Sequence, residues 1–242
     1  MGHSLVFMPE CHSTNDEATR LIQTTKMMDG TVVITANQTA GRGQRGNTWI
    51  VEPGKNLTFS IFIKPSFLQA RDQFYLNMAF SLGVHDYIKD KLDCMVNVKW
   101  PNDVLLNEKK ASGILIENHL HGQHIQHSIV GIGLNVNQKT FAIDTATSLS
   151  MEASQEFDLN DALADLLVFL ETRFIQLRSQ DFKKLTVDYL SSLYRMGEAH
   201  SFKSGDEMFV GTISGIDPSG KLKIETGSGT RHFNVKEVEF VK

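Results

Sequence analysis

The stretch "TAGRGQRGNTW", from Thr39 to Trp49, holds three glycines with the spacing G-x-G-x-x-G, and its context decides the fold. The spacing is shared by dinucleotide-binding turns and by the glycine-rich loop of protein kinases. A dinucleotide-binding turn opens a helix directly after a strand, but residues 47–55 contain Pro53 and Gly54 and lack a helical stripe. The kinase motifs V-A-I-K, H-R-D and D-F-G and the Walker P-loop do not occur in the sequence. The stretch is therefore a glycine-rich loop of a different kind from these three.

The residues of this loop suit a phosphate or a carboxylate. Glycines allow backbone N–H groups to approach a ligand closely, and Arg42 and Arg45 add planar hydrogen-bond donors. Trp49 could stack on a base or close a lid. Residues 37–55 have no periodicity, and loops of this length inside compact domains are usually functional or disordered. The alternative is a solvated basic loop with Trp49 in the core.

Composition limits the class of protein. The chain has 242 residues and a mass of 27.1 kDa, enough for one domain or for one large and one small domain. A net charge of -4 and a pI near 6.1 argue against broad nucleic-acid binding, which needs a basic face. Cys11 and Cys94 form no disulfide framework, and neither a leader sequence nor a membrane span is recognisable. We therefore expect a cytoplasmic protein.

Periodicity predicts a mixed α/β fold (α+β) with a β-sheet flanked by helices over residues 1–195. The segment 196–242 alternates polar and apolar residues between turns, which predicts a separate small β-barrel. Thr14 is predicted to cap the first helix, with Glu17 completing a capping box. The other elements are expected as helices over 72–92, 160–177 and 182–196 and as strands over 31–36, 56–63, 95–100, 103–107, 112–118 and 126–137.

A second group of polar residues lies in "VNVKWPNDVLLNEKKASGILIE", from Val96 to Glu117. A strand ends near Lys99, and Pro101 enforces a turn before Asn102 and Asp103. A hairpin then returns Lys110 and Gly113 beside them. Lysine at this place would stabilise charge at a phosphorus-centred transition state, while asparagine and aspartate could hold a metal or a ribose. The alternative is an ordinary solvated hairpin, because such turns often contain these residue types.

The chain contains, in this order, the segments "STND", "GRGQRGNTW", "KWPNDVLLNEKKASGIL", "GIGLNVN" and "FVGTISGIDPSGKLKIE". Together they resemble the biotin protein ligases, and the resemblance covers essentially the whole chain. It implies a catalytic fold related to class II aminoacyl-tRNA synthetases and lipoate ligases, followed by a small barrel of the Src-homology type.

The resemblance implies that biotin and ATP react to give biotinyl-5′-AMP, and that biotin then passes to a lysine of a biotin carboxyl carrier protein or domain. Mg²⁺ is the implied metal, accompanying ATP. The implied catalytic residues are Lys110, Arg42, Arg45 and Lys99. The implied biotin-binding residues are Ser13, Thr14, Gln38, Gly41, Arg42, Gln44, Lys110 and Gly113. The implied ATP-binding residues are Arg45, Trp49, Asn102, Asp103 and Asn135, with Asp103 and Asn135 also implied as Mg²⁺ ligands.

Two departures from the family pattern bear on function. The family's lid often reads G-R-G-R-R-G, whereas Gln44 stands at one arginine position, and we expect weaker retention of the adenylate. Many relatives carry an N-terminal DNA-binding helix-turn-helix, but here the resemblance begins within the first dozen residues. We therefore expect neither DNA nor a membrane as partner, while a homodimer formed through strand edges stays open.

Two other functions stay open from the sequence. One is a lipoate-type acyl-carrier ligase with the same fold, and the other is a non-catalytic regulator that binds biotin or its adenylate. The histidines of "NHLHGQHIQH" straddle a predicted hairpin turn, so we do not expect them to converge on a metal. Cys11 lies near the predicted pocket without a base to activate it, which favours a passive thiol.

Overall fold

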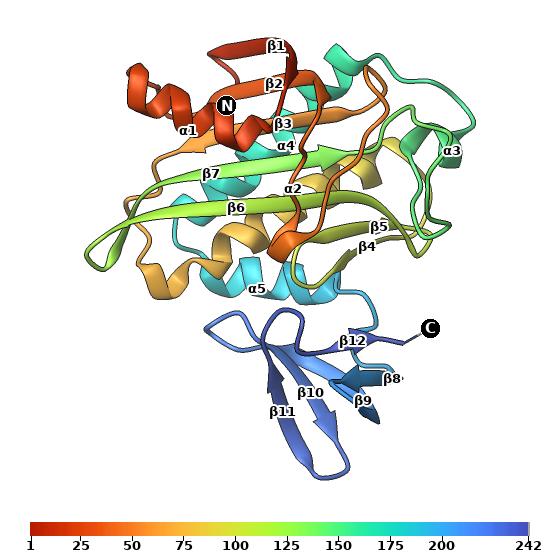
Figure 1. Cartoon of the computed structure of the whole chain (residues 1–242). Helices are drawn as coiled ribbons and strands as arrows, with labels where there is room; N and C mark the ends of the chain where they lie inside the picture. The colour runs from red at the N-terminus through yellow and green to blue at the C-terminus, as the bar shows by residue number, and fades with distance from the viewer. Residues whose placement is uncertain (242) are drawn as a thin grey trace.

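The structure, a computed structural model, describes residues 1–241 apart from the side chain of Arg45. A seven-stranded sheet and its helices form the large upper part of Figure 1, and a small β-domain lies below it. The sheet has the strand order β1-β2-β3-β7-β6-β5-β4, with β1 and β2 parallel and every other pair antiparallel. Its strands are β1 (Leu5–Cys11), β2 (Thr31–Gln38), β3 (Leu57–Ile63), β4 (Val96–Lys99), β5 (Asp103–Leu106), β6 (Lys109–His121) and β7 (His124–Leu134).

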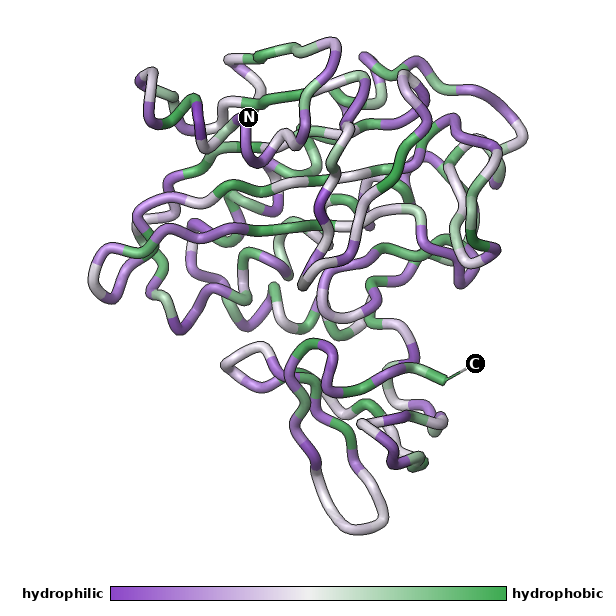
Figure 2. The backbone as a smooth tube through the Cα atoms, in the orientation of Figure 1, coloured by the Kyte–Doolittle hydropathy of each residue, from purple (hydrophilic) through white to green (hydrophobic). Residues whose placement is uncertain are grey.

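Helices cover both faces of this sheet. Helix α1 (Thr14–Thr24) lies on one face, and α2 (Phe74–Lys91) and α4 (Leu159–Arg178) lie on the other (Figure 1). Val32 packs into the large core on the α2 and α4 side, while Val33 packs into a smaller cluster under α1. Adjacent residues of a strand face opposite sides, so one strand serves both cores. Figure 2 shows stretches of apolar residues along the strands of the large sheet.

The first helix is stabilised differently from the prediction. Ser13, not Thr14, precedes the helix, and its side chain makes no capping hydrogen bond. The predicted capping box is wrong because Glu17 pairs with Arg20 instead. The Thr14 N–H donates to Oε1 of Gln38 at 2.8 Å, so a side chain from β2 satisfies the first turn. This tertiary contact links the start of α1 to the end of β2, where the glycine-rich loop begins.

The small domain follows a last helix, α5 (Phe182–Ser191). Its sheet has the order β11-β10-β9-β8-β12 and is antiparallel throughout. Alternating residues build its core, with Phe202, Ile213, Leu222 and Ile224 fully buried. The strands are β8 (Ala199–Ser204), β9 (Glu207–Ile216), β10 (Leu222–Thr226), β11 (Gly229–Phe233) and β12 (Glu239–Phe240).

The predicted helices and strands are present with shifted ends, and two elements besides the 3-10 turns η1 (Gln44–Gly46) and η2 (Ala70–Asp72) were not predicted. These are strand β1 and the short helix α3 (Leu149–Ala153). The β6–β7 hairpin turns only at Gly122 and Gln123, so the strands run further than expected. The predicted domain boundary at 195/196 falls between α5 and β8 and stays a prediction. In residues 1–241, no helix is long and apolar enough to cross a membrane.

An ion network joins the three helices on the core face. Arg173 of α4 binds Asp86 of α2 at 2.6 Å and Asp188 of α5 at 2.5 Å, with 17% of its side chain exposed. Burial alone would raise the pKa of Asp86, but hydrogen bonds from His85 and Arg173 outweigh it and hold that pKa below its ordinary value. Removing the guanidinium would take the arginine partner from both carboxylates and leave Asp86 with His85 alone.

We expect Arg173→Met to lower the free energy of unfolding by about 2–4 kcal/mol. This is somewhat less than the cost of breaking a fully buried ion pair, because the Arg173 side chain is partly exposed. Because the pKa of Asp86 is lowered in the folded state, its pairing stabilises the fold above about pH 4 and is lost as pH falls below that value. The difference between wild type and variant should therefore shrink in acid. Urea unfolding at several pH values measures both effects. The control, Arg178→Met, breaks an exposed pair on the same helix, and an equal loss there would contradict the prediction.

Candidate functional site

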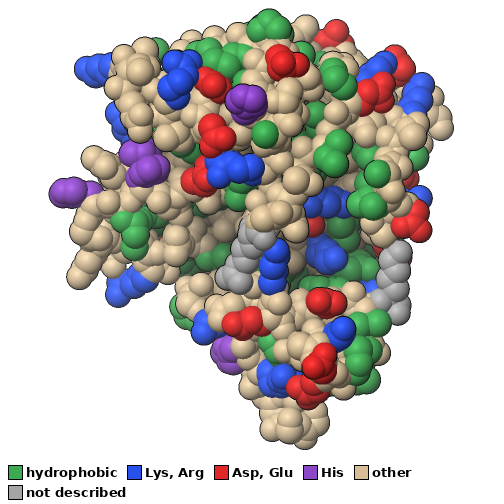
Figure 3. All heavy atoms as spheres, viewed as in Figure 1, with side chains coloured by type: hydrophobic (Ala, Val, Ile, Leu, Met, Phe, Trp, Pro, Cys, Tyr) green, Lys and Arg blue, Asp and Glu red, His purple; other side chains and the backbone are tan. Residues whose placement is uncertain are grey.

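A cavity of about 610 Å³ lies between one face of the large sheet, the glycine-rich loop and the small domain. Figure 3 shows Lys and Arg side chains inside the hollow between the two parts of the molecule. Of the residues predicted from the sequence, the cavity is lined by Ser13, Thr14, Gln38, Arg42, Gln44, Trp49, Lys99, Asn102, Asp103, Lys110 and Gly113. The glycine-rich loop and the segment from Lys99 to Gly113, which lie far apart in the sequence, therefore meet at one site.

Two predicted residues, Gly41 and Asn135, are not among those that line the cavity. Gly41 lies at a second cavity of about 660 Å³ beside the same loop. Asn135 is buried, and its side-chain amide donates to the Thr147 carbonyl at 3.0 Å, so it holds the segment after β7 in place. The side chain of Arg45 lies outside the described part of the chain.

Lys110 and Asp103 form the charged centre of the cavity. The Lys110 ammonium lies 2.7 Å from Oδ1 of Asp103, and 5.7 Å from the centre of the Trp49 ring. Both residues stand at the β5–β6 hairpin, where a register shift after Val104 brings Lys110 opposite Leu105. The Lys110 backbone also exchanges hydrogen bonds with residues Thr145 and Thr147, which fixes the start of β6. The carboxylate thus orients the ammonium toward the cavity.

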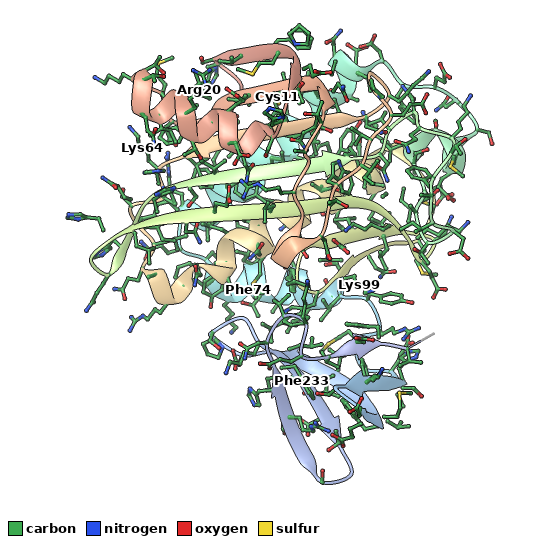
Figure 4. The ribbon with its side chains drawn as sticks, in the orientation of Figure 1. Cys11, Arg20, Lys64, Phe74, Lys99 and Phe233 are labelled. Atoms are coloured by element: carbon green, nitrogen blue, oxygen red, sulfur yellow. The ribbon has the colours of Figure 1, made fainter. Side chains whose placement is uncertain are left out.

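Lys99 supplies a second ammonium from the neighbouring strand end. It is the register partner of Asp103 across the β4–β5 turn, and Figure 4 places it at the junction of the large sheet and the small domain. Burial lowers the pKa of Lys99, and the positive charges of Lys110 and Arg195 lower it further. The negative charge of Asp103 acts in the opposite direction and raises this pKa. A lowered pKa marks an ammonium that has lost part of its water, as expected for a group that awaits an anion.

Asn102 and Trp100 shape the turn between these charges. The Asn102 side-chain amide donates to the carbonyl of Ile114, and the Ile114 N–H donates back to the Asn102 carbonyl at 3.0 Å. Trp100 is buried, and its indole N–H donates to the carbonyl of Gly220 in the small domain at 2.9 Å. Asn102 therefore has a structural use in addition to the predicted nucleotide contact.

The floor of the cavity contains a buried polar network that the sequence reasoning missed. The Ser60 hydroxyl lies 2.7 Å from the Thr14 hydroxyl and 2.6 Å from Oδ1 of Asn15. Gly131 makes room for this amide, because a Cβ there would lie 2.4 Å from the same oxygen. The Asn15 amide donates in turn to Glu117 at 2.7 Å. Asn15 could have been predicted as a site residue, because it belongs to the "STND" segment. No local sequence pattern indicates that Ser60 belongs to the site.

The glycine-rich loop is a small hairpin. The Trp49 N–H donates to the Gly41 carbonyl at 2.9 Å, the Gly43 N–H donates to the Asn47 carbonyl at 2.7 Å, and a single 3-10 turn, η1 (Gln44–Gly46), closes the tip. Its Arg42 guanidinium is held by Asp16 at 2.5 Å and by Glu117 at 3.2 Å. Arg42 thus lies at the cavity wall already paired, and Glu117 links it to the buried floor.

Trp49 lies across the sheet within the cavity. A Cβ on Gly133 would lie 2.2 Å from its indole ring, and a Cβ on Gly113 would lie 3.4 Å from it, so this pair of glycines provides the flat surface on which the ring rests. The indole N–H is buried and has no hydrogen-bond partner among the described residues. The loop therefore covers the cavity as a lid, and its tryptophan leaves one donor available.

The remaining candidates do not form a second site. His119 and His127 are cross-strand partners with stacked rings 4.4 Å apart, so part of the histidine cluster does converge. Nevertheless, residues 1–241 contain no group of three or more His, Cys, Asp or Glu side chains arranged to hold a metal. Cys11 is buried, and burial raises the pKa of its thiol, which fits a passive thiol.

Comparison with known proteins agrees with this geometry. Residues 8–135 match the biotin/lipoate A/B protein ligase family, and residues 201–241 match the biotin protein ligase C-terminal domain. The chain belongs to the biotin protein ligase family. The match to the second domain confirms that a small antiparallel domain follows the catalytic fold. The two matched regions together contain the strands, the lid and the small-domain residues that surround the cavity.

Individual relatives extend over most of the chain. The bifunctional ligase/repressor BirA of Bacillus subtilis is 29% identical over 99% of this chain and 74% of that protein. The biotin–[acetyl-CoA-carboxylase] ligase of Mycobacterium tuberculosis is 31% identical over 84% of this chain and 76% of its own length. Among solved structures, the biotin protein ligase from Aquifex aeolicus in complex with biotin and ATP superimposes with a TM-score of 0.82 at 26% identity, covering 99% of both chains. The predicted mixed sheet flanked by helices is confirmed.

Proposed function

We propose that this chain is an ATP-dependent biotin–protein ligase, which forms biotinyl-5′-AMP and transfers biotin to a lysine of a carrier protein or carrier domain. One observation carries the proposal: Lys110, Lys99 and Arg42 come from separate segments to one cavity of about 610 Å³. This volume lies in the range of pockets that enclose small organic ligands. Two anions, a carboxylate and a triphosphate, must approach each other there, and each needs a cation close by.

We assign the two substrates to different ends of the cavity. The biotin ring system is assigned to the end lined by Ser13, Thr14 and Gln38, with its acyl chain directed toward Gly113, where a Cβ would lie 3.3 Å from the Lys110 ammonium. Gln38 already accepts from the Thr14 N–H, so its amide is held in a fixed orientation for a polar head group. The nucleotide is assigned to the other end, next to Lys99, Asn102 and Asp103, with Trp49 near the adenine.

In the first step, an oxygen of the biotin carboxylate bonds to the α-phosphorus of ATP, and the bond from that phosphorus to pyrophosphate breaks. Negative charge on the α-phosphate oxygens increases in the transition state, and Lys110 is the group that neutralises it. In the second step, a carrier lysine amine bonds to the biotinyl carbonyl carbon, loses a proton, and AMP leaves. The lid then matters because water would otherwise hydrolyse the mixed anhydride.

Magnesium is proposed to enter with the ATP phosphates. Mg²⁺ is usually bound through one or two carboxylates together with substrate phosphates and water, and Asp103 fits the role of such a carboxylate at the cavity wall. Asn135 fits less well, because it is buried, is not among the cavity-lining residues, and donates its amide to the Thr147 carbonyl. The metal would neutralise phosphate charge, and Asp103 would hold it while also orienting Lys110.

The proposal is tested by incubating the protein with ATP, Mg²⁺, labelled biotin and a purified carrier domain. Label on the carrier lysine is the expected result. Pyrophosphate release with lipoate but not with biotin would favour the lipoate-type ligase. Binding of biotin without pyrophosphate release or label transfer would favour the non-catalytic regulator. A carrier domain whose acceptor lysine is replaced by arginine serves as the control for non-specific labelling.

Gln44 gives a prediction about the intermediate. It lines the cavity at a position where the family's lid often has arginine, and an uncharged amide binds an anionic adenylate less tightly than a guanidinium does. We expect Gln44→Arg to lengthen the half-life of the bound adenylate about tenfold, corresponding to one charge-assisted hydrogen bond. The measurement is loss of labelled biotinyl-5′-AMP from the complex on dilution. Gln44→Met, which adds no charge, is the control, and an unchanged half-life in Gln44→Arg would contradict the prediction.

A further inference from the structure

The last strand of the chain reaches the cavity. Strand β12 (Glu239–Phe240) pairs with β8, where Phe240 lies opposite Phe202, and both β12 residues line the cavity together with Val238. Val241, which follows this strand, makes two hydrogen bonds. Its N–H donates to the Ser201 carbonyl at 3.2 Å, and its carbonyl accepts from the Arg195 guanidinium at 2.8 Å. The small domain therefore forms one wall of the proposed active site.

Phe240 covers Lys99. The Lys99 ammonium lies 5.0 Å from the centre of the Phe240 ring, which is within the range of a cation–π interaction. The ring is fixed by aromatic neighbours on two sides. It packs edge-on against Phe202 at 5.5 Å and stacks with Tyr194 at 6.3 Å. A ring held in this way limits the positions open to the lysine side chain.

We propose that Phe240 is a positioning residue for nucleotide binding: its ring covers the Lys99 ammonium, keeps water from it, and directs it at the phosphates of ATP. This rests on the proposed ligase function. Phe240 belongs to the small domain, whereas Lys99 ends a strand of the large sheet. The interaction therefore gives the small domain a specific role in the first reaction step.

Electrostatics supports this role. A cation that has lost water interacts more strongly with an incoming anion, because the local dielectric constant is lower. Burial is the main cause of the lowered pKa of Lys99, and the nearby charges of Lys110 and Arg195 act in the same direction. Asp103 opposes them. An arriving triphosphate would relieve the repulsion among these cations, so the site is prepared for an anion of high charge.

A second contact from the small domain holds Trp100, the residue after Lys99. Trp100 donates its indole N–H to the Gly220 carbonyl at 2.9 Å, and Gly220 has a positive φ of 89° in the β9–β10 turn. A Cβ at Gly220 would lie 2.5 Å from the ring of Phe74, so this turn sits directly on the large domain. Lys99 and Trp100 are thus held from the small domain at consecutive positions.

The experiment compares Phe240→Leu, Phe240→Met and Phe240→Tyr in full-length protein. Loss of the ring should raise the KM for ATP roughly three- to tenfold, the range expected for a partly desolvated cation–π contact, with kcat and the KM for biotin within about twofold of wild type. Phe240→Tyr retains the ring face and should stay close to wild type. Phe209→Leu is the matched control, because Phe209 packs against Phe202 and Phe233 in the same small domain but is not among the cavity-lining residues. Thermal unfolding checks that each variant is folded. If Phe240→Leu is not folded, Phe240→Met is used in its place as the variant without the ring.

A double-mutant cycle separates positioning from simple loss of packing. In a Lys99→Met background, Phe240→Leu should change the KM for ATP less than twofold, because the group that it positions is absent. An unchanged KM in the single variants, or a full effect that persists without Lys99, would overturn the inference. Absence of biotin-dependent pyrophosphate release by the wild type would instead refute the proposed function. In that case calorimetric titration with ATP still decides whether Phe240 affects nucleotide binding.

Discussion

Replacing Lys110 with alanine should lower the rate of biotin-dependent pyrophosphate release by about 10²–10³-fold, the usual cost of removing one well-placed group that stabilises transition-state charge. The structure places this ammonium in the cavity, 2.7 Å from Asp103 and above the Trp49 ring. Its loss leaves the Asp103 carboxylate unpaired, which adds a repulsive charge beside the incoming phosphates. Both changes act on the first step, so kcat should fall more than the affinity for biotin.

Lys109 provides the matched control for this prediction. It is adjacent in the sequence and exposed, and it is not one of the cavity-lining residues. Lys109→Ala should therefore retain pyrophosphate release within about twofold of wild type, as expected for a surface substitution away from the site. Thermal unfolding of both variants checks that the fold is intact. Pyrophosphate release by Lys110→Ala at more than a third of the wild-type rate would remove Lys110 from its proposed role.

The two motifs of the candidate site could be recognised in the sequence because each is a local feature. The glycines and arginines of the lid, and the strand–turn–strand around Asp103, are contiguous stretches whose residue types restrict the backbone. The strands over 31–36 and 56–63 were predicted because β-branched and aromatic residues favour strands and the flanking turns limit them. Both strands lie inside the sheet, not at its edge, and the burial of all of β3 and of most of residues 31–35 agrees with their apolar composition.

What the sequence did not predict depends on contacts between distant residues. Helix α1 was expected to cap itself, yet Gln38 of β2 accepts from its first N–H, which no local pattern indicates. Strand β1 includes Pro9 and lies at the edge of the sheet, where pairing to β2 on one side overrides its weak strand pattern. Arg42 was expected to bind a phosphate or a carboxylate of the ligand, and here it is paired with Asp16 and Glu117 of the protein itself.

Gly41→Ala is the second change for which we expect a large effect. A Cβ at this position would lie 2.2 Å from the Trp49 carbonyl oxygen and 2.5 Å from the Gln38 side-chain nitrogen. The first neighbour is backbone and cannot move without breaking the hairpin hydrogen bond from the Trp49 N–H to the Gly41 carbonyl. The second is the side chain that accepts from Thr14 at the proposed biotin end. One methyl group therefore displaces the lid and the floor together.

A displacement of this size, about 1 Å at a reacting centre, typically costs about 10²-fold in rate. We expect that loss in biotin-dependent pyrophosphate release by Gly41→Ala, with a higher KM for biotin and faster loss of the adenylate, because the lid no longer closes over it. Gly227→Ala is the control, since a Cβ there meets no atom within 4 Å and its φ is not positive. If Gly41→Ala keeps its rate within threefold of wild type, the hairpin can shift without cost, and its contact with Gln38 does not set the geometry of the site.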